Sequence, residues 1–77
     1  MKERVFVTTL ETLGPDGDVI EWTDLCISST FEKAVEYAER YLLYWPCAPD
    51  EQVTVLEMDE TDGELDYQNS ELLWCSE

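Results

Sequence analysis

The sequence contains no histidine and only four Lys and Arg residues, against nineteen Asp and Glu residues. Without histidine, the commonest acid–base group of enzymes is missing. The sequence also lacks a glycine-rich phosphate loop and a serine nucleophile motif. Paired carboxylates can cleave glycosides, but a chain of 77 residues offers little room for a sugar cleft. We therefore expect that the protein is not an enzyme, and we predict no catalytic residue and no cofactor.

No apolar run approaches the roughly 18 residues of a transmembrane helix. The N-terminus continues into alternating, strand-like residues where a signal peptide would have its apolar core. The three cysteines, Cys26, Cys47 and Cys75, form no CxxC pair, and without histidine the usual zinc ligand sets are out of reach. We expect free, buried thiols in a reducing compartment and hence a cytoplasmic protein.

The acidic residues do not form a calcium-binding loop of the EF-hand type. With Gly63 at the glycine position of that loop, the first ligand position would fall on Met58, and with Gly17 it would fall on Thr12. We predict no specific metal site, although clustered carboxylates attract Ca²⁺ or Mg²⁺ weakly.

The charged residues are mostly acidic, which gives the chain a net charge of −15. The hydrophobic fraction of 44% and the aromatic fraction of 12% are too high for a disordered acidic tail, so we predict one folded domain over residues 1–77. Residues 50–77 interleave ten carboxylates with Val, Leu, Tyr and Trp and contain no Lys, Arg or His. This charge disfavours direct binding to nucleic acid or to a membrane, and it favours a cationic partner protein.

Two β-hairpins are predicted, one on each side of a helix. The strands are expected at residues 5–10, 19–27 and 52–58 and from residue 64 to residue 67. Turn residues separate them, with Gly14-Pro15-Asp16-Gly17 in the first hairpin and Asp62-Gly63 in the second. Residues 72–75 are apolar enough to need burial, either as a continuation of the last strand or as a short docked segment.

The helix is predicted over residues 29–45. Ser29 and Glu32 have the S-x-x-E spacing of a capping box. Apolar residues from Phe31 to Trp45 recur at spacings of three and four, which is typical of one buried helix stripe. Pro46 ends the pattern, because residues before a proline tend to leave helical geometry.

The element order β-β-α-β-β predicts an α+β fold, in which a four-stranded antiparallel sheet of order 2-1-3-4 carries the helix on one face. We expect Val5, Val7, Val53 and Val55 to face the helix. We expect Phe6, Leu10, Leu56 and Met58 to face the other side. One helix would leave that second face partly bare, and two copies of the chain could then pair through it as a homodimer.

Three glutamates form the first candidate binding surface. Glu32, Glu36 and Glu39 lie at positions i, i+4 and i+7, which places them on one side of the helix and away from the apolar stripe. The alternative interpretation is an ordinary solvated helix face. Tyr37 and Tyr44 lie off the stripe, and we expect both near the surface, where an exposed Tyr37 among carboxylates would suit a partner-binding anchor.

The second hairpin carries the other candidate surface. Its carboxylates alternate along both strands and are Glu57, Asp59, Asp62, Glu64 and Asp66. Residues two apart on a strand project about 6.6 Å apart, which is within a factor of two of the axial charge spacing of one DNA strand. Such a row could present anions to a basic groove that normally binds nucleic acid. Solubility and protection of the sheet edge are the alternative interpretation.

This layout resembles small phage-encoded inhibitors of bacterial defence, the anti-CRISPR and related DNA-mimic proteins. The size, the β-β-α-β-β order, the helix at 29–45 and the acidic hairpin at 57–66 carry the resemblance, while no motif transfers a functional residue. It implies an inhibitor that occludes a Lys/Arg-rich, nucleic-acid-binding surface of a host protein complex in the bacterial cytoplasm. The alternative function is an acidic structural or oligomeric module, whose charge reflects solubility or adaptation to salt.

Overall fold

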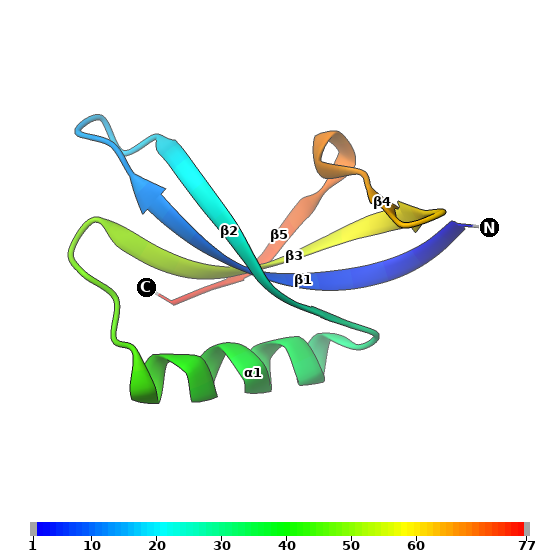
Figure 1. The fold of residues 1–77 in the computed structure, drawn as a ribbon, viewed down its shortest axis with the longest axis horizontal. Helices are drawn as coiled ribbons and strands as arrows, with labels where there is room; N and C mark the ends of the chain where they lie inside the picture. Colours follow the sequence, from blue (N-terminus) through cyan, green and yellow to red (C-terminus); the bar gives the residue numbers. More distant parts are fainter. Residues whose placement is uncertain (1, 77) are drawn as a thin grey trace.

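The computed structural model describes residues 2–76. Along the chain, the elements are β1 (Lys2–Leu13), β2 (Val19–Ser28), α1 (Phe31–Tyr44), β3 (Glu51–Thr61), β4 (Glu64–Leu65), the 3₁₀ turn η1 (Tyr67–Asn69) and β5 (Glu71–Cys75). Over this part of the chain, one helix lies beside a single curled antiparallel sheet (Figure 1). The expected α+β class is therefore confirmed. No helix among these residues is long and apolar enough to cross a membrane.

The sheet has the strand order β2-β1-β3-β4, and β5 also pairs with β3. The predicted last strand is thus divided in two, and the described sheet has five strands instead of four. Local hydrogen bonds explain the division. The Asn69 Nδ2 donates to Asp66 Oδ2 at 2.8 Å, and the Ser70 hydroxyl donates to the Tyr67 carbonyl at 2.7 Å. Such side-chain bonds offer the backbone an alternative to the sheet ladder.

The two predicted hairpin turns are present where the glycines require them. Asp62 and Gly63 have φ values of 52° and 87°, as in the tight turn that Asp-Gly favours. In the first hairpin, Gly17 has a φ of 83° and its N–H donates to the Gly14 carbonyl at 2.9 Å. Left-handed backbone costs little at glycine, so these positions set the reversal of the chain.

The start of α1 differs from the prediction by one residue. Thr30, and not Ser29, is the N-cap, and its hydroxyl accepts from the backbone N–H of Lys33 at 3.3 Å. The capping box of Ser29 with Glu32 is therefore wrong. At the other end, Trp45 caps the helix directly before Pro46, where the proline was expected to stop it.

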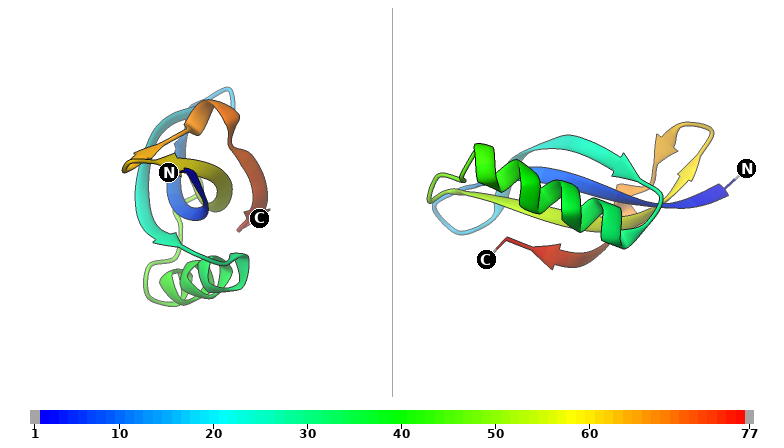
Figure 2. Two further views of the ribbon diagram at one scale, coloured as in Figure 1. Left: turned by 90° about the vertical axis from the view of Figure 1, so that its right-hand side faces the viewer. Right: turned by 90° about the horizontal axis from the view of Figure 1, so that it is seen from below.

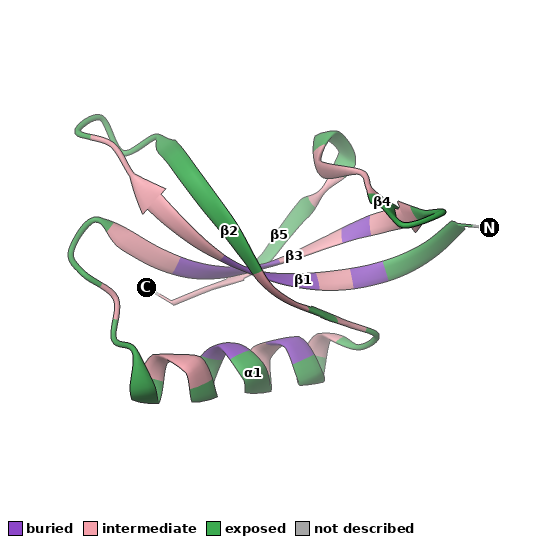
Figure 3. Ribbon diagram, in the orientation of Figure 1, coloured by how far each residue is buried: buried purple, intermediate pink, exposed green. Residues whose placement is uncertain are grey.

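The helix packs on the sheet through small residues. Ala34 and Ala38 are fully buried and form a core cluster with Val53 and Val55 of β3. Their short side chains let the helix backbone approach closely enough for the Thr8 hydroxyl to donate to the Ala34 carbonyl at 3.2 Å. Figure 3 shows this buried zone where α1 faces the centre of the sheet.

The side chains of β1 point to the opposite faces of the sheet from those predicted. Phe6 and Leu10 pack against the helix cluster, whereas Val5 and Val7 form a second buried cluster with Met58. The pairing of Leu10 with Val53 explains this, because directly opposed residues of antiparallel strands share a face. The expected placement of Val5 and Val7 beside the helix is therefore wrong.

The second sheet face is not bare, contrary to the expectation. Leu56, Leu65 and Tyr67 pack against the buried cluster there. Across the open side of the sheet, the Tyr67 hydroxyl donates to Asp24 Oδ2, and the Tyr67 ring lies 6.4 Å from that of Trp22. Figure 2 shows the resulting shape, in which the curled sheet brings β2 and η1 towards each other. This closure covers the centre of the second face, while Trp22 at its rim remains 58% exposed.

Candidate functional site

The outer side of α1 carries the three glutamates that the sequence predicted for it. Because Ala34 and Ala38 face the sheet, Glu32, Glu36 and Glu39 are all exposed. Arg40 Nη2 lies 3.0 Å from Glu36 Oε1, and both side chains are well exposed, so this ion pair contributes little to stability. The helix therefore presents a row of carboxylates to solvent.

The hairpin carboxylates do not form one continuous row. Glu57 and Asp59 are half-buried, and Asp62 and Glu64 lie exposed at the tip. Asp66 accepts the Asn69 bond, and its N–H donates to the Asp59 carbonyl at 3.0 Å. The alternation ends because β4 stops at Leu65.

Basic residues from β1 neutralise part of the hairpin. Arg4 lies 3.1 Å from Asp59 and 3.4 Å from Glu57, and Lys2 lies 3.4 Å from Asp59. The Arg4 hydrogen bond, aided by Lys2, lowers the pKa of Asp59 below its ordinary value. Sequence analysis missed this pairing because the predicted first strand began at residue 5, whereas β1 begins at Lys2.

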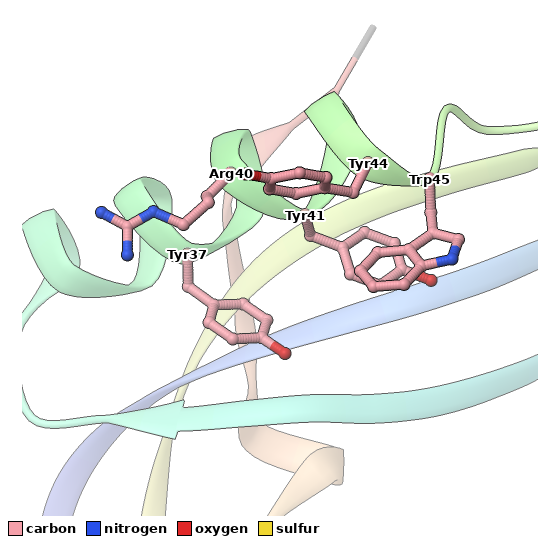
Figure 4. Close-up of a pocket in the computed structure, with 5 residues that line it drawn as sticks. All are labelled: Tyr37, Arg40, Tyr41, Tyr44 and Trp45. Atoms are coloured by element: carbon pink, nitrogen blue, oxygen red, sulfur yellow. The ribbon is translucent and has the colours of Figure 1, made fainter.

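A hollow of about 340 Å³ lies against the C-terminal half of α1. Its lining, called here the aromatic hollow, is Tyr37, Arg40, Tyr41, Tyr44 and Trp45 (Figure 4). Trp45 lies 5.4 Å from Tyr41 and 6.0 Å from Tyr44, measured between ring centroids. The rings therefore form one continuous aromatic surface.

Tyr37 and Tyr44 lie at the surface as predicted, with 37% and 72% of each side chain exposed. Trp45 was expected on the buried stripe of the helix but is 63% exposed. It departs from the stripe because its backbone, at φ −133° and ψ 78°, has already left helical geometry before Pro46. Figure 1 shows that the β1–β2 hairpin curls away from this end of α1.

A second, more polar hollow of about 360 Å³ continues along α1 towards its N-terminus. It shares Tyr37 and Arg40 with the aromatic hollow, and its other lining residues are Cys26, Ser28, Lys33 and Glu36. Along α1, the aromatic hollow thus lies towards the C-terminal end and the polar hollow towards the N-terminal end. The polar hollow also borders the last residues of β2, Cys26 and Ser28.

The three cysteines are free thiols and are half-buried. Burial, followed by the neighbouring Glu51 and Cys75, raises the pKa of the Cys47 thiol, which makes it a poor nucleophile at neutral pH. Within residues 2–76, no group of three or more Cys, Asp or Glu side chains is arranged to hold a metal ion.

Comparison with known protein families, with curated proteins and with solved structures found no match to this chain. The helix offers the exposed carboxylates of Glu32, Glu36 and Glu39 and, separately, the aromatic hollow. Its groups suit recognition of a cationic surface by charge and by ring stacking.

Proposed function

We propose that this protein is a non-catalytic inhibitor, which binds a basic nucleic-acid-binding surface of another protein and blocks it. One observation carries the proposal: a net charge of −15 is carried by an ordered α+β fold. Lys2, Arg4 and Arg40 pair with carboxylates of the chain itself, whereas Glu32 and Glu39 of the helix are exposed to solvent.

The helix carboxylates Glu32, Glu36 and Glu39 are the centre of the proposed surface. Successive members lie about 6 and 4.5 Å apart along the axis, which is within a factor of two of the axial charge spacing of one DNA strand, about 3.4 Å. Tyr37 lines the polar hollow together with Glu36 and would anchor the partner once charge has brought the two surfaces together. Long-range attraction would speed association, and salt would weaken it.

The hairpin has a smaller role in this proposal than the sequence suggested. Glu57 and Asp59 are paired with Lys2 and Arg4, so their charge is largely satisfied within the chain. Glu64 is exposed at the hairpin tip and extends the anionic surface. Pairing of two copies through the second sheet face is not part of the proposal, because Val7 and Met58 are already buried there.

The setting we propose is that of the small phage-encoded inhibitors of bacterial defence. The partner would be a nucleic-acid-handling complex in the bacterial cytoplasm, and inhibition would be competitive occlusion without chemistry. The acidic surface, the small folded domain and the aromatic anchor support this assignment.

The test is a competition experiment with a partner captured from bacterial lysate and then purified. Labelled nucleic acid bound to that partner is titrated with wild-type protein, with the variant E32Q/E36Q/E39Q and with the control D16N/D18N/E21Q. Both variants remove three exposed carboxylates, but the control removes them from the β1–β2 turn and the adjacent strand.

We expect the wild type to displace the nucleic acid. The helix variant should require about tenfold more protein for the same displacement, while the control stays close to wild type. Two results would contradict the proposal: a partner that keeps its nucleic acid while bound to this protein, or an equal loss of affinity in the two variants.

A further inference from the structure

The proposed binding surface of helix carboxylates gives no role to the aromatic hollow. Tyr44 is 72% exposed and Trp45 is 63% exposed, although each could bury a large apolar area. Tyr37, which also lines the hollow, is 37% exposed. Grouped apolar side chains of this kind mark binding sites on folded proteins more often than isolated ones do.

One residue that lines the hollow, Arg40, is positively charged, but its charged group pairs with a carboxylate outside the hollow. Arg40 lines the hollow with its side-chain stem, while its guanidinium pairs with Glu36 at 3.0 Å. Figure 4 shows the guanidinium on the side away from Trp45. The rings of Tyr44 and Trp45 therefore offer a stacking surface that the Arg40 guanidinium does not occupy.

We infer that the aromatic hollow receives an arginine side chain of the partner, with its guanidinium stacked on Trp45 and Tyr44. This inference rests on the proposed function, because it names the chemistry by which the cationic partner is held. A guanidinium is planar and weakly hydrated, so it stacks on aromatic rings at low cost. A lysine ammonium is compact and strongly hydrated, and it gains less from such a surface.

Charge decides between an arginine-bearing partner and a second copy of this chain. Two copies meeting at α1 would bring together two molecules of net charge −15, with exposed Glu32, Glu36 and Glu39 on the helix of each. A partner rich in arginine is attracted by the same field. The hollow and the helix carboxylates then serve one ligand, since the rings take the guanidinium face and the carboxylates take neighbouring cations.

The experiment compares two peptides of equal charge, nona-arginine and nona-lysine, by calorimetric titration at physiological salt. The variants W45L and Y44L each remove a ring and keep an apolar side chain. W22L is the matched control, because Trp22 is 58% exposed and lies outside the hollow. Circular dichroism verifies that each variant is folded.

We expect the wild type and W22L to bind nona-arginine about tenfold more tightly than nona-lysine, which corresponds to about 1.4 kcal/mol. W45L and Y44L should bind both peptides with similar affinity. Equal binding of the two peptides by the wild type overturns the inference and leaves the proposed function standing. A dimer in sedimentation that W45L abolishes also overturns it, because a second copy would then occupy the hollow.

Arginine-selective binding that depends on Trp45 supports the inference even if nucleic acid is not displaced from the captured partner. In that case the proposed inhibition fails and the arginine site remains. The two experiments therefore separate the failure of one idea from the failure of the other.

Discussion

The Tyr67 hydroxyl donates a hydrogen bond to the Asp24 carboxylate and so joins the two ends of the curled sheet, across 43 residues of sequence. Trp22 packs beside the same phenol ring, at 6.4 Å between centroids. Together these contacts hold η1 over the cluster of Val5, Val7 and Met58. We regard this closure as the main reason that a sheet with one helix has two buried clusters.

Removing the Tyr67 hydroxyl should therefore weaken the fold. We expect Y67F to lower the free energy of unfolding by about 1 kcal/mol at neutral pH, because a hydrogen bond to a charged group is lost. Y44F, which alters an exposed phenol, should stay within about 0.5 kcal/mol of wild type. Urea unfolding followed by circular dichroism measures both. Equal stability of Y67F and wild type would show that the bond adds nothing.

Stability should also fall in alkali because of the same pair. Burial, and then the hydrogen bond and charge of Asp24, raise the pKa of Tyr67 to about 12. Because the folded state favours the protonated phenol, its contribution is complete below pH 10 or so, the ordinary tyrosine pKa, and is lost as the pH rises towards 12. Urea unfolding, measured from pH 8 to about pH 12, should show this loss of stability in the wild type. A matching loss in Y67F would assign it to another group.

Thr30 should be the residue that caps α1. T30A removes the oxygen that accepts from the Lys33 N–H, so we expect a loss of about 1 kcal/mol in the free energy of unfolding. S29A should have little effect, since Ser29 only precedes the cap. Thermal unfolding of the two variants measures the difference. A larger effect of S29A would restore the capping box that the sequence predicted.

Arg4 should control the ionisation of Asp59. In R4Q, we expect the pKa of Asp59 to rise towards its ordinary value, because its strongest hydrogen-bond donor is gone. The folded state of the wild type keeps this pKa low, so the pair stabilises the fold above about pH 4 and loses its effect in more acidic solution. An NMR titration of the carboxyl carbons measures the pKa. K33Q removes one base elsewhere and should leave Asp59 unchanged; an equal rise in K33Q would indicate a general charge effect.

Local signals in the sequence predicted the elements well. The Asp62-Gly63 pair fixed the second reversal, and Pro46 stopped the helix, because each acts through its own backbone geometry. Which side chains of β1 point towards the helix could not be predicted from such local signals. Val5, Phe6 and Val7 are all apolar, so the alternation that normally reveals the buried face is absent, and only the register against β3 decides it.

The candidate site divides in a similar manner. Helical spacing correctly placed Glu32, Glu36 and Glu39 in solvent, since it depends only on which stripe is apolar. The pairing of Arg4 with Asp59 joins distant parts of the chain, and it follows from strand order and register together. The aromatic hollow was missed because Trp45 continues the apolar spacing in sequence, while its backbone leaves the helix.

Binding through charge requires that the carboxylates of α1 be held by a folded chain at physiological salt, and α1 packs on Val53 and Val55 of β3. Amide hydrogen exchange, followed by NMR, tests this most directly at Thr54 and Val55, which pair with β1 on one side and β5 on the other. We predict exchange at least about a hundredfold slower than in an unstructured peptide. Exchange at the unstructured rate in this segment would contradict the proposed function, because a flexible anionic chain presents no surface.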